Sequence, residues 1–396
     1  MNESQENRLS FRSHCRHPLR VCAIALLAAL AAAGCSSKAK VREPAKLTDI
    51  ADAKVRASDV WSQGIGKGAD GRPTGLRPLL ESDGLFVAES GGRVLALAPD
   101  SGRELWRKDL KARLSAGPST LGDLVLLGTL DSEVIALKRA TGEELWRASL
   151  SSEVLAPPAG AGNVVVARSI DGRTFGLSAA DGKRLWSFDR TVPTLTLRGI
   201  AAPLVLGNRV LLGMDSGRLA AVQLADGAPL WEQAISVPSG RTELERLADI
   251  DAQLIETSDG VLASSYGGDV TLINPDDGES RWRRAIKTGT GLAVGGSNVY
   301  VADADGLLWA LDAASGAAVW KTDVLQYRRL STPVFFKGYV VVADYQGYLH
   351  FFDPADGKLV GRTRAGREPI LAPMVATDQL LYVYNVEGRL EALTLK

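Results

Sequence analysis

Asp249 and Asp251 are the residues of this sequence whose types and spacing most directly suggest chemistry. They form a close carboxylate pair in a charged stretch, and paired carboxylates are the groups that general acid–base catalysis uses. No metal-binding partner or nucleophile lies near them in the sequence. The sequence therefore favours a binding role over catalysis for this pair, and predicts no catalytic residue, no metal site and no cofactor.

The histidines and cysteines add little further chemistry. Of three cysteines, Cys15 and Cys22 lie in an N-terminal segment that we expect to be removed, and only Cys35 remains. His350 is the one histidine beyond that segment, and its neighbours in Leu349–Phe352 predict a position inside a strand. A histidine-rich or thiol-based site is therefore excluded from the remaining chain.

The N-terminal residues predict a lipoprotein signal peptide over residues 1–34. Four arginines precede an uncharged run, Val21–Ala33, which is too short to span a bilayer comfortably and which ends in small residues before Cys35. We expect acylation of Cys35, and several acyl chains would hold the protein stably in a membrane. Ser36 favours sorting to the outer membrane, and residues 35–57 are expected to form a polar tether.

The charge balance excludes nucleic acid as a partner. The formal net charge is zero at pH 7, and it falls to about −2 once the expected signal peptide is removed.

The elements that must position the aspartates come from a repeat of about 40 residues. The unit is a short apolar strand, a turn with Gly, and a Trp that follows the Gly by three or four residues. It recurs with its Trp at positions 106, 146, 186, 231, 282 and 320, and a seventh copy has Gly361 in place of the Trp. A second series of eight apolar segments, from Leu85–Ala88 to Leu380–Val383, is interleaved with these units.

Four short strands per period are the content of one propeller blade. The chain ends without a final Trp strand, whereas Val60-Trp61 is a Trp strand without a preceding unit. We therefore predict an all-β fold over residues 58–396: an eight-bladed β-propeller of four-stranded antiparallel blades, closed by pairing of the N-terminal strand with the C-terminal blade. The Trp residues are expected to be core residues that bridge adjacent blades.

Two segments interrupt the repeat, and loops of this kind are where a propeller binds its partners. The first contains Leu195, Leu197 and Arg198; the two leucines suit a partner contact as well as they suit an outer strand that faces the core. The second, residues 238–251, has the length of about two helical turns and contains Asp249 and Asp251. Together they suggest a protein-recognition surface of Leu and Arg beside two Asp.

Two other functions follow from the repeat. Ala310–Trp320 resembles the tryptophan-docking repeat of the pyrroloquinoline-quinone dehydrogenases, which raises the alternative of a calcium- and quinone-dependent enzyme. A shared repeat is evidence for a shared fold only. The other alternative is a periplasmic carbohydrate-binding propeller, which needs aromatic side chains near the axis; Tyr266, Tyr345 and Tyr348 are the candidates.

The signal sequence, the degenerate repeats, Leu195–Gly199 and Gly240–Asp251 together resemble the BamB family of outer-membrane protein assembly lipoproteins. This resemblance implies a non-catalytic scaffold of the β-barrel assembly machinery on the periplasmic face of the outer membrane. It implies that Leu195, Leu197, Arg198, Asp249 and Asp251 bind the POTRA domains of BamA, with other subunits and unfolded outer-membrane proteins as further partners. Gly361 departs from the repeat and puts one blade junction in doubt.

Overall fold

The computed structural model describes residues 42–396 apart from 70–74, 198, 200, 238–240 and 244. Every regular element in this part of the chain is a β-strand, and Pro44–Lys396 form one compact unit. Among the residues described, none belongs to a helix with the length and apolarity needed to cross a membrane. The expected signal peptide and Cys35 lie outside the described residues.

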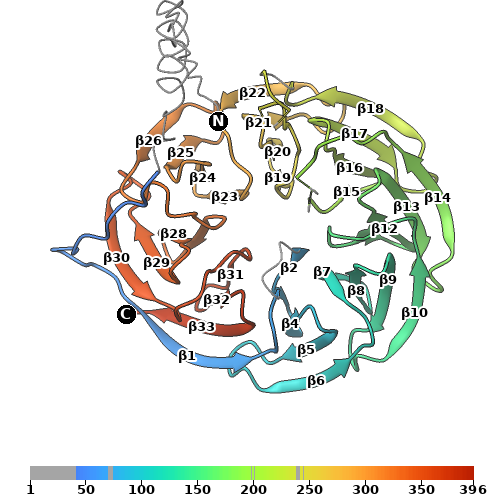
Figure 1. The fold of residues 1–396 in the computed structure, drawn as a ribbon, viewed down its shortest axis with the longest axis horizontal. Helices are drawn as coiled ribbons and strands as arrows, with labels where there is room; N and C mark the ends of the chain where they lie inside the picture. The colour runs from blue at the N-terminus through green and yellow to red at the C-terminus, as the bar shows by residue number, and fades with distance from the viewer. Residues whose placement is uncertain (1–41, 70–74, 198, 200, 238–240, 244) are drawn as a thin grey trace, which may run out of the picture. The chain divides into compact units, whose positions relative to one another are not determined.

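The strands form eight antiparallel blades arranged in a ring (Figure 1). Blade 1 consists of β3 (Leu79–Glu81), β4 (Gly84–Ala88), β5 (Arg93–Leu97) and β6 (Glu104–Asp109). Blade 2 consists of β7 (Leu114–Leu121), β8 (Leu124–Thr129), β9 (Glu133–Lys138) and β10 (Glu144–Ser149), with the short β2 (Gly75–Leu76) parallel to β7. Blade 3 consists of β11 (Ala159–Ala161), β12 (Val164–Arg168), β13 (Arg173–Ser178) and β14 (Arg184–Asp189). Blade 4 consists of β15 (Leu204–Leu206), β16 (Arg209–Gly213), β17 (Arg218–Gln223) and β18 (Pro229–Ala234).

The second half of the ring repeats this order. Blade 5 consists of β19 (Ile255–Thr257), β20 (Gly260–Ser264), β21 (Asp269–Ile273) and β22 (Ser280–Ala285). Blade 6 consists of β23 (Leu292–Gly295), β24 (Asn298–Ala302), β25 (Leu308–Asp312) and β26 (Ala318–Thr322). Blade 7 consists of β27 (Val334–Phe336), β28 (Tyr339–Ala343), β29 (Tyr348–Phe352) and β30 (Leu359–Arg364). Blade 8 consists of β31 (Val375–Ala376), β32 (Leu381–Tyr384), β33 (Arg389–Leu395) and β1 (Ala57–Gly64).

The predicted closure of the ring is confirmed. β1 pairs antiparallel with β33, with Ala57 opposite Leu395 and Gly64 opposite Arg389, so the first strand is the outer strand of the last blade. The eight-bladed fold and its N-terminal closing strand were therefore predictable from the spacing of the Trp units.

The core lies between neighbouring blades. The two middle strands of each blade are apolar along their length and are buried because another blade covers each face. The outer strands instead alternate between buried and exposed residues, as β14 does. Burial is therefore carried by the middle strands, and the outer strands form the rim.

Seven junctions between blades share one tryptophan contact, which confirms the predicted bridging role. In each, the indole Nε1–H donates to a backbone carbonyl of the next blade; Trp146, for example, bonds the Ala179 carbonyl at 2.9 Å. The ring also packs on the turn glycine of that blade, and a Cβ on Gly182 would lie 2.6 Å from the Trp146 ring. The other indole donors are Trp61, Trp106, Trp186, Trp231, Trp282 and Trp320.

The eighth junction, between blades 7 and 8, is built differently because Gly361 has no side chain to offer. Val55, 5% exposed, fills this place: a Cβ on Gly361 would lie 2.3 Å from the Val55 carbonyl oxygen and 2.6 Å from its Cγ1. The Lys54 amide donates to the Val360 carbonyl at 2.8 Å, and the Ala57 amide donates to the Thr363 hydroxyl at 2.9 Å. The N-terminal segment therefore replaces the missing Trp.

The start of the same segment is held by a buried polar network in blade 7. Arg328 donates to the Ala45 carbonyl at 2.9 Å and pairs with Asp344, and Asp344 accepts a bond from His350 at 2.9 Å. Arg362 contacts His350 and donates to the Thr48 carbonyl at 2.9 Å. His350 lies within β29, as its neighbours predict, and burial lowers the pKa of its imidazole although Asp344 opposes this shift. We call residues 44–56 the strap; it is the described part of the segment that the sequence predicts as a tether.

Candidate partner-binding surface

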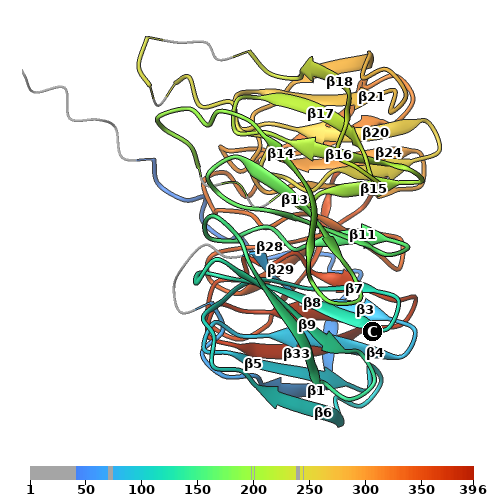
Figure 2. The same cartoon turned by 90° about the vertical axis from the view of Figure 1, so that its right-hand side faces the viewer.

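The two irregular segments join consecutive blades on one face of the propeller. Residues 190–203 connect β14 to β15, and residues 235–254 connect β18 to β19. Figure 2 shows both segments projecting from the same side of the ring, the left side in that view. The fold thus brings together two stretches that the sequence separates by about 50 residues.

One hydrogen bond joins the two segments directly. The Leu197 amide donates to Asp249 Oδ1 at 3.0 Å, so a carboxylate of the second segment holds the backbone of the first. Leu195 and Leu197 are 45% and 40% exposed, and Val237 of the second segment is 67% exposed. Apolar side chains presented to solvent on a braced backbone are typical of a protein-binding surface.

Beneath these side chains lies a cluster of three carboxylates, which we call the acidic cluster: Asp215, Asp249 and Asp251. One oxygen atom from each lies within 4.8 Å of the others, and Asp249 is only 1% exposed. Asp215 comes from the β16–β17 turn and pairs with Arg168 Nη2 at 2.6 Å, and the Arg168 Nη1 donates to the Gly213 carbonyl. Blades 3 and 4 and the loop that leads to blade 5 therefore supply one buried charged site.

The acidic cluster contains more negative charge than its described partners balance. Asp249 Oδ2 and Asp251 Oδ1 are buried without a hydrogen-bond partner among the residues that the structure describes. Burial, followed by the neighbouring carboxylates, raises the pKa of Asp251 to about 7, and burial also raises the pKa of Asp249. Such a site can take up a proton, a small cation, or the guanidinium or ammonium group of a basic side chain.

Gly199 covers this cluster closely. A Cβ at this position would lie 2.5 Å from Asp251 Oδ1 and 3.1 Å from Asp215 Oδ1. Only glycine lets the backbone of the first segment approach the carboxylates to this distance. The approach explains why a glycine directly follows Arg198 in the sequence.

The structure revises the predicted surface in two respects. Asp249 and Asp251 are not exposed beside the leucines, because they lie buried at 1% and 9% exposure and brace the loop from below. The predicted helical turns of the second segment are wrong for its described residues, where one turn closed by the bond from the Arg246 amide to the Thr242 carbonyl is followed by extended chain. The side chain of Arg198 lies outside the described residues.

Arg168 and Asp215 are functional candidates that the sequence reasoning missed. A signal for Arg168 exists, because it ends the second strand of blade 3 where other blades have small or aliphatic residues such as Ala88, Ala302 and Ala343. Asp215 lies in an Asp-Ser-Gly turn, and a turn aspartate has no sequence mark that tells it from the many others.

The tyrosines named for a carbohydrate site are dispersed around the ring. Tyr266 lies between β20 and β21 in blade 5, whereas Tyr345 and Tyr348 belong to blade 7 and pack against Arg328 and Arg364 at 5.1 and 5.0 Å. Their rings are therefore engaged by arginines of blade 7 and of the loop before it.

Comparison with known proteins agrees with this geometry. Residues 90–322 match the family model described as outer membrane protein assembly factor BamB. Outer membrane protein assembly factor BamB of Pseudomonas aeruginosa is 43% identical over 374 residues, which cover 94% of this chain and 98% of the relative. The protein of the same name from Marinobacter adhaerens is 47% identical over 94% of this chain and 95% of the relative.

Solved structures give the same result for the fold. The crystal structure of BamB from Moraxella catarrhalis superposes with a TM-score of 0.77 at 25% identity and covers 86% of this chain and 100% of its own. The quinohemoprotein alcohol dehydrogenase of Comamonas testosteroni superposes with a TM-score of 0.67 at 12% identity, over 85% of this chain and 76% of its own, which shows a shared fold alone. The chain belongs to the BamB family of outer membrane protein assembly factors.

Proposed function

We propose that this protein is a non-catalytic scaffold of the outer-membrane β-barrel assembly machinery, and that it binds the POTRA domains of BamA through the surface formed by residues 190–203 and 235–254. The observation that carries the proposal is the pair of exposed leucines, Leu195 and Leu197, on a backbone that Asp249 braces. The names of the relatives support the assembly role. The similarity to a quinohemoprotein dehydrogenase does not favour an enzyme, because it concerns the fold at 12% identity.

The five residues have different roles in this proposal. Leu195 and Leu197 supply apolar contact area, and Arg198 supplies a charged group that suits an interface. Asp249 is a positioning residue, because its carboxylate accepts the Leu197 amide and is itself buried. Asp251, near the limit of solvent access, retains an unpaired oxygen that can receive a basic group.

We further propose that a lipid on Cys35 holds the protein at the periplasmic face of the outer membrane, after removal of the signal peptide 1–34. Other subunits of the machinery are proposed partners as well. Unfolded outer-membrane proteins would meet the rim, where exposed aliphatic residues such as Leu145 and Leu185 lie on the outer strands.

Co-purification with BamA from solubilised membranes tests the interface. The double variant Leu195→Asp/Leu197→Asp should lose BamA, because removing central apolar contacts typically costs about 2 kcal/mol or more each. The matched control is Leu185→Asp, which is equally exposed at 50% but lies on the outer strand β14. If the folded double variant retains as much BamA as Leu185→Asp does, the assigned surface is wrong.

Asp249→Asn tests the positioning role. An amide can still offer an oxygen to the Leu197 amide, so this variant should bind BamA more strongly than Asp249→Ala. Equal binding by the two variants would show that the bond between the segments has no role in recognition.

A further inference from the structure

A second charged site lies on the same face of the propeller, far along the ring from the acidic cluster. It is a shallow pocket of about 530 Å³ at the junction of blades 7 and 8, formed by the end of β30, the β30–β31 loop, the β32–β33 turn and β1. Three arginines line it: Arg364, Arg367 and Arg389. The family role proposed above makes no use of this pocket.

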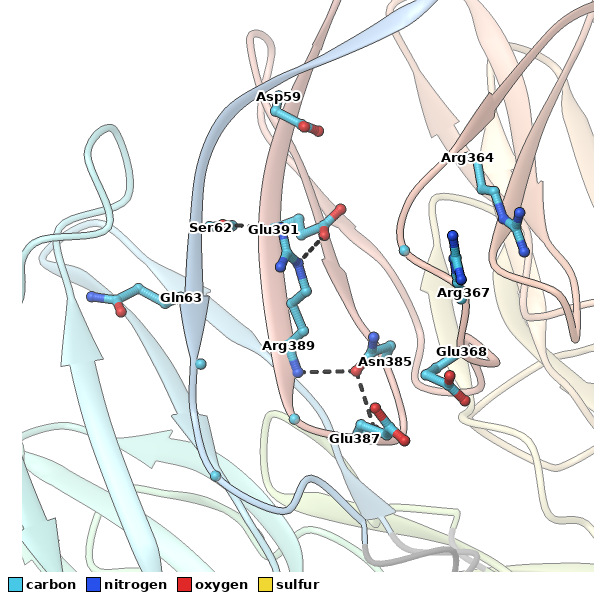
Figure 3. Close-up of a pocket in the computed structure, with 14 residues that line it drawn as sticks. Asp59, Ser62, Gln63, Arg364, Arg367, Glu368, Asn385, Glu387, Arg389 and Glu391 are labelled. Carbon is cyan, nitrogen blue, oxygen red and sulfur yellow. Dashed lines mark hydrogen bonds and ion pairs between the residues drawn. The ribbon is translucent and has the colours of Figure 1, made fainter.

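Two of these arginines are not neutralised. Arg389 pairs with Glu391, whereas Arg364 and Arg367 are exposed and have no carboxylate partner among the residues described. Figure 3 shows the guanidinium ends of Arg364 and Arg367 at one end of the pocket, with Glu368 and Glu387 at the other. Two neighbouring guanidinium groups without a carboxylate between them are suited to a phosphate, which each can bind with two N–H groups.

Arg364 is held in place by its own strand. Its guanidinium lies 5.0 Å from the centre of the Tyr348 ring, and the two residues are paired across β29 and β30. Stacking on an aromatic ring fixes the plane of an arginine and leaves its N–H groups free to bind an anion.

The pocket lies beside the point where the strap joins the propeller. Arg362, two residues before Arg364 and hence on the same face of β30, donates to the Thr48 carbonyl. Arg329, a further exposed arginine without a described carboxylate partner, lies in the loop whose Gln326 carbonyl accepts the Ala45 amide. The start of the strap therefore runs between unpaired arginines.

We propose that Arg364 and Arg367 bind the phosphate of an anionic phospholipid headgroup, so that this edge of the propeller docks on the membrane that holds the anchor. The inference rests on the proposed lipid at Cys35. A fully extended chain from Cys35 to Ala45 reaches at most about 35 Å, so the anchored protein keeps these arginines close to the bilayer surface. Surface potentials act over about 10 Å at moderate salt, and phosphatidylglycerol supplies both the negative potential and the phosphate.

The test uses the lipoprotein reconstituted in vesicles of phosphatidylcholine alone, of phosphatidylcholine with phosphatidylglycerol, and of phosphatidylcholine with inorganic phosphate in solution. Hydrogen–deuterium exchange of residues 364–368 and 385–389 is the measurement. Protection should rise with phosphatidylglycerol only, fall at high salt, and decrease about fivefold for each arginine changed in Arg364→Gln and Arg367→Gln. The control is Arg103→Gln/Arg281→Gln, which removes the same charge from exposed positions in blades 1 and 5 and should leave the protection unchanged.

Two results would overturn the proposal. Equal protection in all vesicles, or in the arginine variants and the control, shows that no headgroup is bound. Protection by inorganic phosphate as strong as that by phosphatidylglycerol shows a site for free phosphate and not for a membrane. The mass of the purified chain shows separately whether Cys35 is acylated, and an unacylated chain can be assayed by adding the same vesicles from outside.

Discussion

Seven of the blade junctions and the junction between blades 7 and 8 solve the same packing problem with different means. At the seven, one Trp fills the gap, donates its indole N–H to the next blade and packs on a glycine, as Trp146 does with Ala179 and Gly182. At the eighth, a backbone segment that is remote in sequence fills the gap left by Gly361. A propeller thus tolerates loss of a repeat residue when another part of the chain supplies equal volume and replaces the hydrogen bonds.

Replacing a junction Trp should have the largest effect. Trp146→Ala removes a ring that is only 8% exposed and leaves a cavity between blades 2 and 3, which should lower the free energy of unfolding by about 3–5 kcal/mol. Urea unfolding followed by tryptophan fluorescence measures this. Leu145→Ala, next to it and 47% exposed, is the control and should cost less than about 0.5 kcal/mol.

The strap should be nearly as important at its own junction. Val55→Asp places a charge where Val55 packs on Gly361, and should cost about 2–4 kcal/mol through lost apolar burial and an unpaired carboxylate. Arg56→Asp changes the exposed neighbour and serves as the control. Equal denaturation midpoints for the two variants would mean that the strap does not support the junction.

Restoring the repeat residue should harm this protein. In Gly361→Trp the first side-chain carbon already meets the Val55 carbonyl oxygen at 2.3 Å, so the indole can enter only by displacing the strap, at a cost of about 1–3 kcal/mol. Thermal unfolding together with exchange of the residue 44–56 amides gives the answer. A more stable variant with an unchanged strap would refute the view that Val55 substitutes for the Trp.

The acidic cluster should give the smallest effect, and one that the Trp junctions lack. The pKa of Asp251 is raised to about 7, so between about pH 4 and pH 7 the folded chain holds a proton that the unfolded chain has released. Stability from this group is therefore present at low pH and is lost as the pH rises through 7. Asp251→Asn should flatten this loss in urea titrations at a series of pH values, whereas an unchanged slope would show that Asp251 is ionised throughout.

The sequence predicted the regular part of the molecule well because each blade repeats one local solution. The spacing of Trp106, Trp146 and Trp186 set the period, and the unmatched Trp61 indicated the closing strand. The strap was not predictable, since its residues are polar and its contacts, such as Arg328 with the Ala45 carbonyl, join positions hundreds of residues apart. The meeting of Leu197 with Asp249 was expected only as a shared surface, and the burial of the aspartates depends on Arg168, Asp215 and Gly199, each of which is locally ordinary.

The pairing of β1 with β33 also sets an order of events in the life of the chain. Ala57 is among the first residues of the propeller to be made, and its partner Leu395 is the second-last residue of the protein. At bacterial rates of roughly 5–20 residues per second, the first strand waits tens of seconds for its partner. Throughout that time both ends of the unfinished ring expose unpaired strand edges, so the newly made protein needs protection from aggregation until its last residues arrive.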